Sequence, residues 1–181
     1  MSDVLEAVYR GDRDEAEQLA AGRELDVFEA AALGRTERLR QLLDEDASRV
    51  KAFGADGFHP LGLACFFGHV DAAQLLLDRG ADVNATAADG RTALHGAALQ
   101  GYDDVIKFLA SHGADLNAQD RKGFTPLDTA LGKAGGFGFA GQEGVVREGT
   151  AAVLRSLMGA NATPAAANRQ GLTETAVAAQ H

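Results

Sequence analysis

The sequence has few of the residues that mark secreted, metal-binding or membrane-spanning proteins. Tryptophan is absent, and Cys65 is the single cysteine among 181 residues. One cysteine forms no disulfide within the chain and supplies no pair of thiolate ligands for zinc. No apolar run approaches the ~20 residues of a membrane helix, so we expect no membrane-spanning segment. The N-terminal residues lack the basic and apolar segments of a signal peptide, which predicts a cytoplasmic protein.

Basic residues are also in short supply. The chain has 17 Lys and Arg against 26 Asp and Glu, a net charge of −9. This balance disfavours nucleic acid or an anionic membrane as the main partner and mildly favours a basic one. Arginine outnumbers lysine 13 to 4 and alanine is abundant, which we interpret as a sign of a GC-rich bacterial genome.

A 33-residue repeat dominates the middle of the chain. The segment from Asp56 to Leu61 returns 33 residues later as Asp89 to Leu94, and Gly80 to Ala85 returns as Gly113 to Ala118. A constant period of this length indicates stacked structural repeats, each of which contacts only its neighbours.

The repeated pattern resembles the ankyrin repeat. The matching elements are Thr92 to His95, the Ala97-Ala98 pair, the Gly68-His69 turn, the Leu75 to Leu77 run and the two segments that begin with Gly-Ala-Asp at the end of each repeat. The resemblance implies an all-α repeat fold, a solenoid of stacked helix-turn-helix pairs with short β-hairpins. It also implies that His69 and His95 brace turns by hydrogen bonding. Small residues such as Ala97 allow helices to approach closely.

When the repeat pattern is extended over the whole chain, it predicts one domain, residues 1–181, built of six units. They are an N-terminal capping helix pair (1–22), a degenerate repeat (23–55), two full repeats (56–88 and 89–121), a repeat with a glycine-rich insert (122–161, insert 132–148) and a C-terminal half repeat (162–181). The first unit lacks about ten residues, the length of one hairpin, which is why we interpret it as a cap. Its exposed helix can then be polar.

The glycine-rich insert is expected to be a mobile loop that contacts the concave face. It contains Gly136 to Gly141, which spells Gly-x-Gly-x-x-Gly. That motif binds dinucleotides only between a β-strand and a helix, and no strand is predicted before it. We therefore expect no cofactor. None of the five histidines has metal-ligand spacing relative to another, so no metal site is predicted either.

The ankyrin resemblance implies that a protein or peptide partner binds the concave face. The positions concerned lie beside the hairpin glycines and before the Gly-His turns. They carry Tyr9, Leu33, Phe58, Phe66, Phe67, Arg91, Leu99, Gln100 and Phe124, and the insert adds Phe137 and Phe139.

Large apolar side chains at these positions are expected to be exposed, because other residues already fill the core positions. Leu61, Ala64, Leu75 and Leu76 occupy those core positions. An exposed stripe of phenylalanine side chains is expected to be covered by another apolar surface. Two covers are consistent with the sequence: a partner, or the insert itself.

Three functions remain open at this point. The first is a monomeric protein-interaction module with a Phe-rich binding face. The second is an acidic adaptor, antitoxin-like or immunity-like, that inhibits a basic enzyme, and strong salt dependence of binding would identify it. The third is an enzyme with a polar cleft beside the insert, which we disfavour because no nucleophile motif is present.

Overall fold

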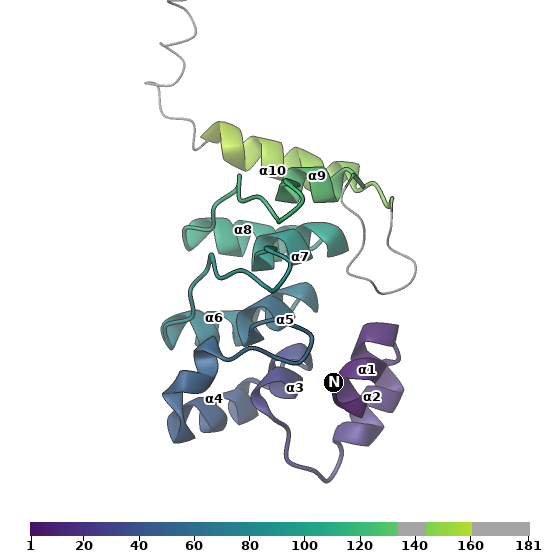
Figure 1. Ribbon diagram of the computed structural model, residues 1–181, viewed down its shortest axis with the longest axis vertical. Helices are drawn as coiled ribbons and strands as arrows, with labels where there is room; N and C mark the ends of the chain where they lie inside the picture. The colour runs from purple at the N-terminus through teal and green to yellow at the C-terminus, as the bar shows by residue number, and fades with distance from the viewer. Residues whose placement is uncertain (134–143, 161–181) are drawn as a thin grey trace, which may run out of the picture.

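Short helices follow one another in pairs along the chain, and the pairs stack into an elongated array (Figure 1). The computed structural model describes residues 1–133 and 144–160. The elements are α1 (Asp3–Arg10), α2 (Arg13–Ala20), α3 (Val27–Ala32), α4 (Thr36–Glu45), the 3-10 helix η1 (Ala47–Lys51), α5 (Pro60–Phe66), α6 (Val70–Asp78), α7 (Ala93–Gln100), α8 (Asp103–Ser111), α9 (Pro126–Ala130) and α10 (Glu148–Ala160). The predicted all-α repeat solenoid is confirmed.

Local sequence explains where these helices begin and turn. Pro60 and Pro126 occupy the first turn of α5 and α9, where the missing N–H would have no helical partner anyway. The Thr125 hydroxyl accepts the Asp128 N–H and so caps α9. Gly68 and Gly101 follow α5 and α7 with φ values of +81° and +79°, a conformation that favours glycine and allows the tight turn into the next helix.

Between helix pairs the chain bends into three similar loops, the fingers, at residues 54–58, 87–91 and 120–124. Each is closed by two backbone hydrogen bonds. The N–H of the first residue donates to the carbonyl oxygen of the last one, and the carbonyl oxygen of the first residue accepts from the glycine in fourth position, Gly57, Gly90 or Gly123. Within the described residues, the only β-type pairing is an isolated bridge between Thr86 and Thr92. The hairpins are therefore tight turns with almost no strand.

The helices form two rows. In the inner row α3, α5, α7 and α9 pack side by side, and the outer row contains α4, α6, α8 and α10. Ala64, Ala97 and Ala130, each 33 residues from the next, are fully buried in the inner row and let its helices approach. Leu76, Ile106, Leu109 and Leu154 fill the space between the rows. Leu61, Ala64, Leu75 and Leu76 are all buried, as the sequence predicts.

Two connections between units have structure of their own. The segment from Asp44 to Gly54 contains the end of α4 and the 3-10 helix η1. The insert leaves α9 and returns at α10 through a narrow base, because a Cβ built on Gly132 would lie 2.9 Å from the Gly144 carbonyl oxygen. Phe137, Phe139 and the predicted half repeat 162–181 lie outside the described residues.

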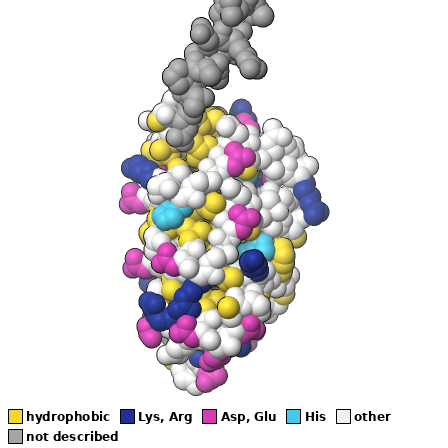
Figure 2. Space-filling view, turned by 90° about the vertical axis from the view of Figure 1, so that its left-hand side faces the viewer, with side chains coloured by type: hydrophobic (Ala, Val, Ile, Leu, Met, Phe, Trp, Pro, Cys, Tyr) yellow, Lys and Arg dark blue, Asp and Glu magenta, His cyan; other side chains and the backbone are white. Residues whose placement is uncertain are grey.

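The N-terminal pair α1–α2 does not extend the two rows in line. It lies to one side of α3 and α5 in Figure 1, so that α1 touches α3 while α2 packs mainly on α1. Figure 2 shows the side of the molecule that lies on the left in Figure 1, away from α1–α2. On this side acidic and basic side chains are interspersed, and hydrophobic ones form patches between them. None of the helices in the described ranges has the length and apolar character needed to cross a bilayer.

Candidate functional site

An aromatic cluster joins the N-terminal pair to the end of α5. The Tyr9 ring lies 5.3 Å from the Phe67 ring and 6.1 Å from the Phe66 ring, centroid to centroid. Phe66 and Phe67 meet edge to face at 5.0 Å. Such pairs each contribute about 0.5–1.5 kcal/mol beyond the apolar area that they bury. Three of the residues predicted for the binding face are thus in mutual contact.

The Tyr9 hydroxyl anchors this cluster to the first finger. It donates to Oδ2 of Asp56 at 2.9 Å, while Oδ1 of Asp56 accepts the Phe58 N–H at 3.0 Å. Burial and the neighbouring Asp56 carboxylate raise the pKa of Tyr9 well above its usual range. Tyr9 therefore remains a hydrogen-bond donor at physiological pH, and it links a finger to the end of an inner helix.

The fingers and the inner row form one surface, the inner face, which is the predicted concave one. The expectation that Phe66 and Leu99 are exposed on it is wrong, because their exposed fractions are 7% and 3%. Arg91, which is also predicted for the binding face, is buried as well, with 5% of its surface exposed. Phe66 packs against α7 at Gly96, where an added Cβ would lie 3.3 Å from its ring. Leu99 lies in the last turn of α7, and Nε of Arg147 donates to its carbonyl oxygen. Side chains at these positions therefore serve packing between neighbouring units.

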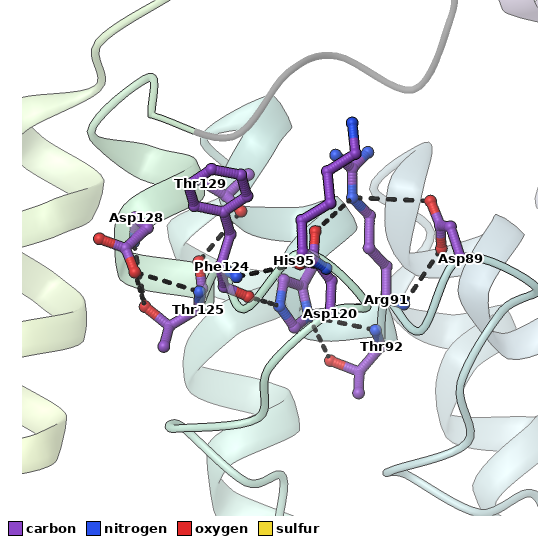
Figure 3. A network of polar contacts seen from close by, with 10 residues as sticks. Asp89, Arg91, Thr92, His95, Asp120, Phe124, Thr125, Asp128 and Thr129 are labelled. Atoms are coloured by element: carbon purple, nitrogen blue, oxygen red, sulfur yellow. Dashed lines mark hydrogen bonds and ion pairs between the residues drawn. The ribbon is translucent and has the colours of Figure 1, made fainter.

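Arg91 is held between two carboxylates of successive fingers (Figure 3). Its Nε lies 3.4 Å from Oδ2 of Asp120 and 3.6 Å from Oδ2 of Asp89. Although burial opposes it, N–H groups of Phe124 and Lys122 and the Arg91 guanidinium hold the pKa of Asp120 below its usual range. The Arg91 side chain thus ties one finger to the next and is not offered to a partner.

His95 extends the same network into the next finger (Figure 3). Its Nδ1 accepts the Thr92 N–H at 3.1 Å, so Nε2 carries the proton and donates to the Phe124 carbonyl oxygen at 3.0 Å. Burial lowers the pKa of His95, which keeps the ring neutral. In the same way Nε2 of His69 contacts the Ala32 carbonyl oxygen at 2.9 Å. Both histidines brace neighbouring units, as the resemblance implies.

The remaining predicted residues are half-buried and leave part of their surface on the inner face. They are Leu33 at the end of α3, Phe58 and Phe124 in fingers, Phe67 after α5, and Gln100 at the end of α7. Leu33 and Phe67 also line a hollow of about 140 Å³ together with Val8 and His69. Apolar side chains therefore remain accessible in the middle of this face.

The finger tips carry charges that change sign along the array. Asp56 and Asp89 lie on the first two fingers, and Arg121 and Lys122 lie on the third. Asp89, Arg121 and Lys122 are exposed, whereas Asp56 is half-buried beneath Tyr9. A ligand that runs along the fingers would meet acidic side chains first and basic ones last.

The described residues contain no group of three His, Cys, Asp or Glu side chains arranged to hold a metal ion. Burial raises the pKa of the Cys65 thiol to about 12, so this thiol stays protonated and unreactive at neutral pH. Cys65 is fully buried in α5, at the position that Ala98 occupies one repeat later.

Two residues that form contacts between neighbouring units are not predicted from the sequence. Asp120 resembles any acidic loop residue, and only its 33-residue offset from Ala87 places it in a finger, beside Arg91. Arg147 lies near the end of the insert, and the repeat pattern assigns no contact there. The first unit lacks a finger, and this is the one feature of the sequence which indicates that α1–α2 does not continue the two rows of helices.

Comparison with known proteins supports the repeat assignment. The family model described as "Ankyrin repeats (3 copies)" matches residues 5–87, 27–120 and 86–137. The chain is also 36% identical over 54 residues to "Ankyrin repeat and SAM domain-containing protein 6" of Danio rerio. That match covers 30% of this chain and 7% of the relative, so it extends to a small part of that protein.

Proposed function

Because the chain belongs to the ankyrin repeat family, we propose that it binds a protein or peptide partner through its inner face. Ankyrin repeats are generally protein–protein interaction modules. The observation that carries the proposal is the row of half-exposed apolar side chains, Leu33, Phe58 and Phe67, beside charged finger tips. An apolar centre with a charged rim is the usual composition of a protein interface.

The burial of several predicted residues narrows the proposed contact set. Phe66, Arg91 and Leu99 support the scaffold, while Leu33, Phe58, Phe67, Gln100 and Phe124 keep accessible surface. Partly exposed aromatic residues at the centre of a patch are typical binding hot spots. We propose that Phe58 and Phe67 contribute most to partner affinity. Phe137 and Phe139 of the insert remain predicted contacts.

A photocrosslinking experiment tests this surface directly. A photoreactive phenylalanine analogue is placed at Phe67 in the full chain and exposed to extract from the source cells. The same analogue at Phe108, which lies on outer helix α8 against His112, is the matched control. We expect one discrete crosslinked protein at position 67 and none at position 108. Equal crosslinking at both positions would contradict an inner-face site.

Once a partner is identified, Phe67→Asp measures the apolar contribution. We expect an affinity loss of about 10-fold or more, because the charged group must be buried unpaired in the interface. Phe66→Asp is unsuitable, because Phe66 is a buried scaffold residue. Circular dichroism of the variant confirms that the helices remain.

The net charge of −9 supports a second candidate, an inhibitor of a basic enzyme. Salt separates the two, because exposed charge pairs are screened over about 10 Å at 0.1 M salt whereas apolar contact is not. Affinity that changes less than about threefold between 0.05 and 0.3 M salt supports the apolar inner face. A steeper loss supports the inhibitor.

We propose no catalytic step for this chain, since ankyrin repeats are typically non-enzymatic. The expected monomeric state and cytoplasmic location rest on the sequence. Light scattering of the purified chain across a concentration series tests the first of these, with a constant mass as the expected result.

A further inference from the structure

We propose that the helix pair α1–α2 is a detachable internal ligand that covers part of the inner face. In this view Tyr9 occupies the site on Asp56, Phe66 and Phe67 until a partner displaces it. The inference rests on the proposed function, because a cover has a role only where there is a face to cover. The contacts that support it belong to α1, α2 and the first finger.

The position of Tyr9 shows that α1 lies across the inner face. Its hydroxyl reaches Asp56 in the first finger and its ring reaches Phe67 beyond the end of α5. Both belong to the helix pair after α3–α4, so α1 passes over the neighbouring unit. An ordinary end unit would contact α3 alone. The ring therefore sits where the family pattern places a partner.

The fit beneath the N-terminal pair is incomplete. One hollow of about 140 Å³ lies between α1–α2 and the ends of α3 and α5, lined in part by Val8, Leu33 and Phe67. A wider open hollow of about 710 Å³ lies between α2 and the start of α4, where the ion pair of Glu17 with Arg35 is the polar contact that opening would have to break. The hollow beneath α1–α2 therefore leaves part of this contact unfilled, and unfilled space forfeits packing energy.

The linker to α3 is suited to opening. Gly22 is exposed with φ of +76°, and a Cβ added there would meet no atom within 4 Å. Beyond it the chain is fixed again, since Leu25 is buried and its carbonyl oxygen accepts from Arg38. Rotation about Gly22 can thus release α1–α2 without disturbing α3. Leu5, which belongs to the core of the stack, and Val8 and Tyr9, which pack against that core, are the residues of α1 that the docked state covers.

The chemistry of the contact specifies what can replace the internal ligand. The site accepts a flat aromatic ring on Phe66 and Phe67 and a hydroxyl donor on the Asp56 carboxylate. A helical partner segment that carries a tyrosine satisfies both requirements. Phenylalanine would leave the carboxylate without this donor, and an acidic residue would be repelled by it.

The two tyrosines and the absence of tryptophan allow a direct test. In a Tyr102→Phe chain, Tyr9 is the only tyrosine, and its emission reports whether α1 is docked. Urea unfolding is followed by Tyr9 emission and by far-UV circular dichroism. We expect the Tyr9 midpoint about 1 M below the midpoint of the helical signal, because a small unit opens first. Coincident midpoints would overturn the proposal.

Asp56→Asn and Asp89→Asn form a matched pair in that background. Both side chains accept a backbone N–H two residues on, at Phe58 and Arg91, and an amide oxygen can keep that bond. Only Asp56 contacts Tyr9. Asp56→Asn should lower the Tyr9 midpoint further, and Asp89→Asn should leave the Tyr9 midpoint unchanged, because its lost contact is to Arg91 in the stack. Equal effects of the two would contradict a specific latch.

The last part of the test measures partner affinity. Tyr9→Ala should raise the affinity for the crosslinked partner about 5-fold or more, since the cover no longer competes. An unchanged or lower affinity, with Phe67→Asp still harmful, overturns the internal ligand while the proposed function stands. If no partner is captured at position 67, the proposed function fails, and the urea experiment still decides whether α1–α2 detaches.

Discussion

His95 and Phe124 are joined across two neighbouring units by one hydrogen bond. Nε2 of the ring donates to the Phe124 carbonyl oxygen at 3.0 Å, while Nδ1 accepts the Thr92 N–H. A second proton on Nδ1 would face that N–H. The Thr92 contact therefore depends on a neutral ring, and the stability of the stack depends on pH.

We predict that stability falls as the pH drops from 7 to 5. Burial lowers the pKa of both His69 and His95 below 6.5, so the unfolded chain takes up protons more readily than the folded one. Their contribution is complete above 6.5 and is lost progressively as the pH falls through the lower folded-state values. Urea midpoints at pH 7, 6 and 5 measure the effect.

A pair of variants assigns this pH dependence. His95→Gln should flatten the slope and cost about 1–3 kcal/mol at pH 7, because buried polar groups of Thr92 and Phe124 lose a partner. His112→Gln, at the exposed end of α8, should leave the slope unchanged. A slope that survives in a double His69→Gln/His95→Gln chain would contradict the assignment.

The helix-pair turns predict that Gly68→Val and Gly101→Val each destabilise the array by about 1–3 kcal/mol, since valine resists positive φ. A Cβ at Gly101 would also lie 2.8 Å from Cδ of Arg147. Gly62→Ala is the control, because Gly62 lies within α5 and its added Cβ would meet only Phe58, at 3.7 Å. Melting temperatures should fall for both valine variants and hold or rise for the control.

Removing Arg91 should be costly despite its position on the predicted binding face. Arg91→Leu leaves the buried Asp120 carboxylate without its cation, and we expect a loss of roughly 3 kcal/mol of unfolding free energy. Arg121→Leu, at an exposed finger tip, should change stability by less than about 0.5 kcal/mol. Chemical denaturation at 0.05 and 0.5 M salt measures both; similar losses for the two would argue against the buried pair.

Shortening the insert should leave the stack intact. Its base is already closed at Gly132 and Gly144, and Arg147 is fixed by a 2.7 Å hydrogen bond from its N–H to the Ala130 carbonyl oxygen. Replacing residues 134–143 by a short Gly-Ser turn should therefore change the unfolding free energy by less than about 1 kcal/mol. If partner affinity changes while stability does not, the insert is part of the binding face. If neither changes, the insert contributes neither to binding nor to stability.

Much of the fold is readable from the sequence because each helix pair repeats the same local instructions. Pro60 and Pro126 start helices, Gly68 and Gly101 turn them, and Ala64 and its repeats space the inner row. These are short-range effects of backbone conformation and side-chain size. They act within one unit and hold wherever that unit stands in the stack.

The candidate site was less predictable. A position beside a finger or at a helix end can face a partner, a neighbouring unit or another part of the same chain. Arg91 and Phe66 match binding positions by offset, yet Asp120 and Gly96 of the next unit bury them. The repeat pattern records where a side chain starts and leaves open what lies opposite it.

The sequence by itself determined the helix pairs, their order and the surface on which a partner is expected. Only the tertiary structure decided that Tyr9 lies on Asp56 and Phe67, because this contact joins residues 47 and 58 positions apart in the sequence. The first unit has no finger to hold it in register, so the apolar side of α1 packs where tertiary contact buries it best. That choice depends on the shapes of α3 and α5 once they are folded together, and no local pattern encodes it.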